Sequence, residues 1–282
     1  MATAILTAAV AALAQTFEVV SIKLRNDRRG PLTSMETMVY RDYAGLMPNG
    51  RFRLTAAPTR TLIQLAYGVR DFQVVGEPSW VDDERYDIDA KAEASPSREQ
   101  LRPMLQALLA DRFKLVIRRE TRTSRAYELV PARGGLKITP TPSGGCYDPR
   151  SPSGPAPVFL GPLTQCDGLR RRILTTPPDR VDRIEAVAVR MSRLVDVVID
   201  EVGRAVIDRT AFDQPFDFVL EFTPNVAASD YTGPQTVRDP AVSASAVPIS
   251  TALQEQLGIQ LRSKNGPVDT IVIERIARPS EN

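Results

Sequence analysis

The stretch from Tyr86 to Val130 constrains the fold more than any other part of the chain, because strand and helix periodicities follow one another in it. From Tyr86 to Ala90, apolar and charged residues alternate, which is typical of a strand with one buried face. Two further strands rich in branched residues are predicted at Lys114 to Glu120 and at Ala126 to Val130, joined by a polar turn into an antiparallel hairpin. Between them and the first strand lies a predicted helix whose apolar residues form one stripe: Leu101, Met104, Leu105, Leu108 and Leu109.

Two starts for this helix remain open. Ser95 followed by Pro96 would place a proline at the first helical position. Ser97 with Gln100 would instead form a capping box. The sequence does not choose between them.

The second half of the chain repeats the pattern of the first half. Phe216 to Leu220 shows the alternation of Tyr86 to Ala90, with the same aspartate after the aromatic residue. The other correspondences are Arg183 to Ala188 with Arg53 to Pro58, Arg193 to Gly203 with Thr59 to Tyr67, Ala205 to Asp208 with Phe72 to Val75, and Leu253 to Leu257 with Leu105 to Leu109. Ile259 to Leu261 and Asp269 to Ile276 repeat the closing hairpin, with Asn265-Gly266-Pro267 as its turn. The chain is therefore predicted to be α+β, with two similar modules of strand-helix-strand-strand-helix-strand-strand, whose mixed or antiparallel sheets are covered by helices.

These patterns divide the chain into four parts. Residues 1–14 are predicted to be a signal peptide, and residues 15–130 the first module, which begins with strands such as Phe17 to Leu24 and Glu36 to Tyr43. Residues 131–181 are rich in proline and glycine and predict a surface connector. Residues 182–282 form the second module, in which 224–248 has few large apolar side chains and is predicted to be a flexible insert.

The signal peptide is inferred from an apolar, uncharged start that ends in Ala12-Leu13-Ala14, a small-x-small cleavage pattern. It predicts an exported protein, periplasmic or extracellular, that begins near Gln15. No basic residue precedes the apolar run, so a buried N-terminal helix is the alternative. At about 13 residues the run is shorter than the roughly 20 that span a bilayer, and no transmembrane segment is predicted in the mature chain.

The two cysteines, Cys146 and Cys166, both lie in the predicted connector. In an exported chain such a pair is expected to form a disulfide. The bridge would stabilise a segment that has little core of its own.

Four segments resemble the soil-associated family of exported bacterial proteins of unknown function: FEVVSIKL, GRFRLTAAPTRTLIQLAYGVRDFQVVGEPSWVDDERYDIDAKA, SREQLRPMLQALLADRFKLVIRRET and STALQEQLGIQLRSKNGPVDTIVIERIARPSEN. In that family LLADRFKL, TALQEQLG and the terminal PSEN recur together in this order. The resemblance implies export and, from copies fused to membrane-bound sensor peptidases, a sensing role. It implies no activity, cofactor or catalytic residue. Each half is also similar in element order to the short N-terminal domain of secretins and TonB-dependent receptors, a small periplasmic interaction fold.

The chain contains no histidine, which excludes Ser-His-Asp and Cys-His catalysis and HExxH zinc sites. It also lacks a P-loop, a G-x-S-x-G elbow, an S-x-x-K motif and a dinucleotide-binding glycine pattern. The remaining acidic candidates for acid and base roles or for calcium binding are Asp82-Asp83-Glu84, Asp87 with Asp89, and Asp196 with Asp200. Strand alternation places Asp87 and Asp89 on a solvent face, so no catalytic or metal-binding residue and no cofactor is assigned.

Basic residues number 36 against 34 acidic ones, and only 6% of residues are aromatic, so nucleic-acid binding is not indicated. The densest basic clusters, Arg170-Arg171-Arg172 and Arg118-Arg119, could contact an anion but are more typical of solvated faces. Trp80, the only tryptophan, could line a pocket or cap the core. A similar choice between stacking and packing applies to a set of tyrosines: Tyr67, Tyr127 and Tyr147.

The favoured hypothesis is a non-enzymatic binding or sensing module of the cell envelope. It would recognise an envelope protein or peptide through a sheet edge or a groove between the repeats. The alternatives are a carboxylate-dependent hydrolase acting on an envelope glycan, and a structural envelope protein.

Overall fold

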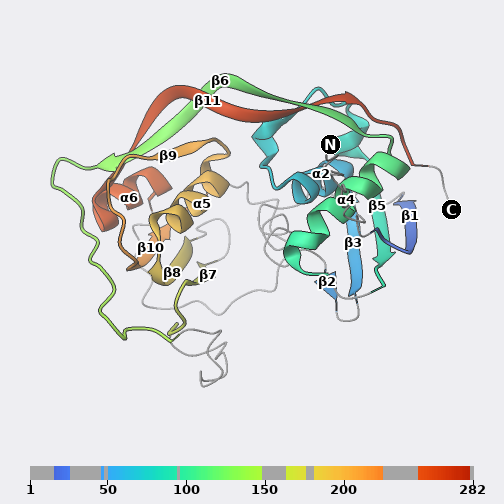
Figure 1. Ribbon diagram of the computed structural model, residues 1–282. Helices are drawn as coiled ribbons and strands as arrows, with labels where there is room; N and C mark the ends of the chain where they lie inside the picture. Colours follow the sequence, from blue (N-terminus) through green and yellow to red (C-terminus); the bar gives the residue numbers. More distant parts are fainter. Residues whose placement is uncertain are drawn as a thin grey trace, which may run out of the picture. The chain divides into compact units, whose positions relative to one another are not determined.

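The computed structural model describes residues 16–25, 46–47, 50–93, 96–147, 163–175, 181–224 and 247–279 (Figure 1). The predicted signal peptide, the strand expected at Glu36 to Tyr43 and almost all of the insert at 224–248 lie outside these residues. The fold is α+β. It divides into two compact units: unit 1 contains Met1–Glu120 and Thr270–Asn282, and unit 2 contains Thr121–Asp269.

Unit 1 has a four-stranded sheet in the order β1-β5-β3-β2, in which β5 is antiparallel to both β1 and β3. Its strands are β1 (Val19–Arg25), β2 (Leu46–Met47), β3 (Arg51–Pro58) and β5 (Arg85–Lys91). Its other elements are α2 (Thr59–Tyr67), the 3-10 turn η2 (Asp71–Gln73), β4 (Val74–Val75), α3 (Trp80–Asp83) and α4 (Arg98–Arg112). The buried faces of α2 and α4 pack on one side of the sheet, and residues described on its other face, such as Arg51 and Arg53, are exposed.

The ends of both long helices follow from local sequence. The helix α2 stops at Gly68, whose backbone is left-handed with a φ of 64°, a conformation that glycine adopts without strain. The helix α4 starts after Ser97, whose hydroxyl accepts from the Gln100 N–H while the Gln100 side chain accepts from the Ser97 N–H. Of the two starts that the sequence left open, the capping box is the one formed.

Unit 2 repeats this arrangement with a three-stranded antiparallel sheet in the order β10-β8-β7. Its elements are β7 (Gly168–Thr175), β8 (Val181–Val189), α5 (Met191–Val202), β9 (Val206–Asp208), β10 (Phe216–Phe222) and α6 (Ile249–Leu257). The two helices end at left-handed glycines, Gly203 and Gly258. The core lies between these helices and the inner face of the sheet.

One detail shows that the two sheets are copies of one design. In each, an alanine with positive φ interrupts the pairing of two strands, Ala56 in β3 and Ala188 in β8. The freed N–H donates to the carboxylate of the aspartate that follows the aromatic residue, Asp87 in unit 1 and Asp217 in unit 2, at 2.8 Å in both. The repeated aspartate in the sequence therefore holds a repeated β-bulge.

The predicted closing hairpins are wrong. The strands β6 (Val116–Pro131) and β11 (Ile259–Arg275) are each continuous. The expected turn at Thr121 to Arg125 holds two β-branched threonines and no glycine, proline or asparagine, so its composition suits an extended strand better than a tight turn. The other expected turn, at Asn265 to Pro267, stays extended because β11 is hydrogen-bonded to β6.

Side-chain contacts along the third sheet, β4-β11-β6-β9, give the direction of this pairing. Arg118 contacts Glu274, Thr121 donates to Asp269 at 2.7 Å, and Lys264 donates to Glu128 at 2.9 Å. Positions rise along β6 as they fall along β11, so the two strands are antiparallel.

The last strand of each repeat belongs to the unit that is formed mainly by the other repeat. Tyr127 to Leu129, in the second half of β6, belong to unit 2 and pair in parallel with β9. Ile271 and Val272, near the end of β11, belong to unit 1 and pair in parallel with β4. The two repeats have thus exchanged their last strands.

Part of the range predicted as a connector, 131–181, is ordered into unit 2. The strand β7 lies within this range, and Leu136 and Ile138 pack against the core. The run of arginines in β7 conceals its strand character, because their side chains hide the usual contrast between apolar and polar faces.

Candidate functional site

The outermost strand of the unit 1 sheet, β1, has β5 as its only neighbouring strand among the described residues. The N–H of Ala92 donates to the Gly50 carbonyl, so even-numbered residues of β5 bond toward β3 and odd-numbered ones toward β1. In the register of the pair, Ser21 lies opposite Asp89, so the odd-numbered residues of β1 bond to the odd-numbered residues of β5. The even-numbered residues of β1 therefore direct their backbone groups to the side away from β5.

This open side of β1 carries both apolar and cationic groups. Leu24 is 41% exposed, although it is a large apolar residue in a strand. The guanidinium of Arg112, at the end of α4, reaches over to donate to the Val20 carbonyl at 3.4 Å. A sheet edge with these properties can accept a further strand.

The two aspartates of β5 lie on the solvent face of the sheet, where alternation predicted them. Asp89 accepts from Arg51 at 2.7 Å and from Arg53 at 2.8 Å, and the hydrogen bond from Arg51 is the main cause that lowers its pKa to about 2. Asp87 holds the bulge at Ala56 and contacts Arg25. Both carboxylates are engaged in structural ion pairs.

The acidic run beside Trp80 is divided between two arginines. Asp82 pairs with Arg60, whereas Glu84 accepts from Arg278 at 2.8 Å, which is the main cause that lowers the pKa of Glu84. The guanidinium of Arg278 also lies 5.1 Å from the centre of the Trp80 ring, which packs partly buried against the core of unit 1. These residues fasten the chain after β11 to α3.

Unit 2 contains a buried ionic cluster that the sequence did not reveal. Arg171 pairs with Asp182 and, at 2.7 Å, with Glu201, and its guanidinium lies 5.6 Å from the ring centre of Phe222. The side chains of Asp182 and Glu201 are only 0% and 5% exposed. Burial is the main cause that raises the pKa of Glu201.

The predicted pair on α5 lies beside this cluster rather than in it. Asp196 and Asp200 are part-buried on the helix, whereas Glu201, the next residue, enters the cluster. Glu201 could have been suspected from its place among the apolar residues of α5. Asp182, the other carboxylate that pairs with Arg171, has no sequence signal of burial beyond its position at the start of a strand.

The other two members of the predicted arginine triplet, and the shorter cluster, are also paired. Arg170 donates to Glu185 at 3.1 Å, Arg172 lies 3.9 Å from the same carboxylate, and Arg118 pairs with Glu120. Arg119 lies 5.8 Å from the ring centre of Tyr67. Both clusters are thus bound to carboxylates or an aromatic ring. Of the other tyrosines, Tyr127 packs against the core of unit 2. The backbone of Tyr147 forms a β-bridge with that of Gln165.

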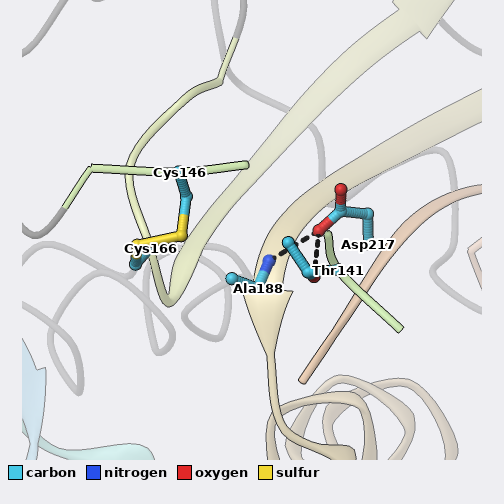
Figure 2. Close-up of a disulfide and its surroundings, with 5 residues drawn as sticks. All are labelled: Thr141, Cys146, Cys166, Ala188 and Asp217. Atoms are coloured by element: carbon cyan, nitrogen blue, oxygen red, sulfur yellow. Dashed lines mark hydrogen bonds between the residues drawn. A yellow bond between two sulfur atoms is a disulfide. The ribbon is translucent and has the colours of Figure 1, made fainter. Parts of the chain in front are cut away.

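The two cysteines form a disulfide, with their Cα atoms 5.0 Å apart (Figure 2). The chain just before Cys146 is held by Thr141, whose hydroxyl lies 2.6 Å from the same Asp217 oxygen that accepts from Ala188. The bridge therefore ties this segment to the turn before β7, beside the bulge of unit 2.

A cavity of about 520 Å³ opens at the end of α6 in unit 2. Its charged and polar lining comes from Arg133 and Lys137 on one side, and from Gln254, Glu255 and Gln260 on the other. Glu255 is the one carboxylate of this lining, so the cavity does not hold the pair that glycoside hydrolysis requires.

Two kinds of feature are absent from the described part of the chain. No helix there has the length and apolar character to cross a membrane. No group of three or more acidic or cysteine side chains there could hold a metal ion.

Comparison with known proteins places the chain in a family. No curated protein and no solved structure matches it. A family model described as "Protein of unknown function (DUF3738)" matches residues 60–276, which include most of both repeats, and the chain belongs to this family.

Proposed function

We propose that this protein is an exported, non-enzymatic binding or sensing module of the cell envelope, which docks an extended segment of a partner protein on the open edge of β1. The observation that carries the proposal is the edge itself. Ile22 and Leu24 direct backbone groups away from β5, and Leu24 is exposed beside them. Main-chain hydrogen bonds would supply affinity, and the side chains of alternate residues would supply specificity.

The charges around β1 favour a partner segment with acidic residues. Lys23 is exposed on the outer face of the strand, and Arg112 lies at the open side. Acidic side chains on an added strand would face these cations, and opposite charges across neighbouring strands are stabilising. Apolar residues of the same segment would cover Leu24.

The alternative of a carboxylate-dependent hydrolase fits the described residues less well. The buried carboxylates, Asp182 and Glu201, share Arg171 and have almost no contact with solvent. Those on the sheet surface, such as Asp89, are held ionised by arginines, whereas a catalytic acid needs a raised pKa.

The test is to select binding peptides from a displayed random library and to measure their affinity for the wild-type protein and for Leu24→Pro. Proline at position 24 removes an N–H that faces the open side and leaves the bonds to β5 intact. We expect the substitution to weaken selected peptides by about tenfold or more. A matched control is Val219→Pro, since Val219 is exposed on the edge strand β10 of unit 2.

Equal affinity of Leu24→Pro and the control for every selected peptide would refute the docking edge. Reproducible turnover of ester, phosphate or glycoside substrates, abolished by replacing one carboxylate, would refute the non-enzymatic assignment and favour the hydrolase.

A further inference from the structure

The cavity at the end of α6 has walls fixed by backbone contacts. The N–H groups of Ala132 and Lys137 donate to the carbonyls of Gly258 and Leu257, both at 2.9 Å. Gly258 has a φ of +66°, and a Cβ atom there would collide with the Gly135 carbonyl oxygen. The turn at residues 132–135 is therefore packed directly on the end of the helix, and the cavity beside it needs no rearrangement to exist.

Lys137 belongs to the wall rather than to the space inside it. Its ammonium donates to the Glu255 carbonyl at 2.6 Å, in the last turn of α6. A cation at this position offsets the negative end of the helix dipole. The carboxylate of Glu255 is separate from this contact.

Opposite charges remain on the two walls. Arg133 lines the cavity from the turn, and Glu255 lines it from α6. Gln254 and Gln260 belong to the same lining, and their carboxamides can donate and accept hydrogen bonds. A Cβ atom at Gly134 or Gly135 would meet nothing within 4 Å, so neither glycine is packed against another residue there.

We infer that this cavity binds a small zwitterionic ligand of dipeptide size. Arg133 would hold the carboxylate through paired N–H donors, and Glu255 would hold the ammonium group. The glutamine side chains would bond the amide between these groups. The volume of about 520 Å³ lies in the range of small-molecule sites. The inference does not rest on the docking edge, because every lining residue belongs to unit 2 and β1 belongs to unit 1.

The experiment is calorimetric titration of the full chain with a panel of free dipeptides that have apolar, polar and acidic side chains. Each binding dipeptide is then compared with its N-acetyl and C-amide forms. A hydrogen-bonded charge contributes enough that Arg133→Ala or Glu255→Gln should each weaken a free dipeptide by about tenfold. Arg262→Ala, an exposed arginine of β11 outside the lining, is the matched control and should leave affinity unchanged.

The blocked ligands separate specific recognition from general surface charge. Acetylation should weaken binding to the wild-type protein, and Glu255→Gln should then cause no further loss. Amidation of the carboxyl end should also weaken binding to the wild-type protein, and Arg133→Ala should then cause no further loss. The inference is overturned if no dipeptide of the panel binds, or if blocked and free forms bind equally. It is also overturned if the Arg133 and Glu255 variants keep wild-type affinity while circular dichroism shows them folded.

Discussion

Replacing Arg171 with leucine should destabilise the protein at pH 7 by about 3 to 5 kcal/mol, the usual cost of removing one partner from a buried ion pair. Arg171 is 12% exposed, and two carboxylates depend on it, Asp182 and Glu201. Without it both buried carboxylates would lose the cation that they share. The upper part of the range is expected, because the contact with the Phe222 ring is lost as well.

The loss should shrink as the pH falls. Burial already raises the pKa of Glu201 above its ordinary 4.5, and removing Arg171 raises it further. A carboxyl with a raised pKa in the folded state contributes most stability below the unfolded value of 4.5, and loses it as the pH rises through the folded value. Relative to the wild type, the variant should therefore recover up to about 1.4 kcal/mol per pH unit as the pH falls from the folded-state pKa of Glu201 in the variant to its lower folded-state pKa in the wild type.

Urea denaturation followed by far-ultraviolet circular dichroism, at pH 7 and at pH 5, measures both effects. The matched control is Arg172→Leu on the same strand, because Arg172 is 44% exposed and 3.9 Å from Glu185. It should change stability by less than about 1 kcal/mol. Adding Asp182→Asn and Glu201→Gln to Arg171→Leu should restore much of the loss, since no buried charge is then unpaired. Equal costs for Arg171→Leu and Arg172→Leu, or a gap that widens at pH 5, would refute the reasoning.

Three further outcomes are expected. NMR titration should give Asp89 a pKa of about 2, so its carboxylate stabilises the fold above pH 3.8 and this stabilisation is lost as the pH falls toward 2. Asp89→Asn should cost only about 1 kcal/mol, because the ion pair of Asp89 with Arg51 is partly exposed to solvent. Lys114 follows the C-cap residue of α4 and has a φ of 51°, in the left-handed region that glycine adopts without strain. Lys114→Gly should therefore stabilise the protein by about 0.5 to 1 kcal/mol and raise the urea midpoint, and a lowered midpoint would contradict this. Alkylation of the unreduced, denatured protein should find no thiol at Cys146 or Cys166, and replacing both with alanine should cost about 3 kcal/mol by chain entropy; two reactive thiols would exclude the bridge.

Local periodicity was sufficient to predict most elements of the fold. All five residues of the apolar stripe predicted from Leu101 to Leu109 are buried on α4. The repeat was predictable because the alternation around Asp87 recurs around Asp217. Such patterns depend on neighbours a few residues apart, which a single sequence displays directly.

Pairings between distant residues were not predictable in the same way. A strand that continues and a hairpin that turns back have the same alternation on either side of Thr121 to Arg125, and the choice depends on which strand lies beside them. The sequence also gave no reason to connect Arg171 with Asp182 and Glu201, because an arginine in a polar run resembles a solvated one. Long-range pairing is invisible to periodicity, and both errors have this cause.

Differences between the two repeats locate both candidate sites better than their common framework does. The strand β5 is paired on both sides, by β1 and β3, whereas its counterpart β10 is paired by β8 and has no full strand opposite among the described residues. The side of β10 away from β8 is met by the single bridge of Pro140 with Phe216, and by Gln256, whose carboxamide bonds both the N–H and the carbonyl of Glu221.

The side chain of Gln256 thus makes, at Glu221, the two backbone bonds that a neighbouring strand would make. In unit 1 the strand β1 lies at this place beside β5, and its outer side forms the open edge. The cavity, in contrast, depends on a residue of unit 2. It depends on Gly258, against which the turn at residues 132–135 packs, whereas the left-handed residue that follows α4 in unit 1 is Lys114, which carries a Cβ atom. Each unit therefore carries its candidate site at a place where the other copy cannot, which is the arrangement expected if the two copies acquired different ligands after duplication.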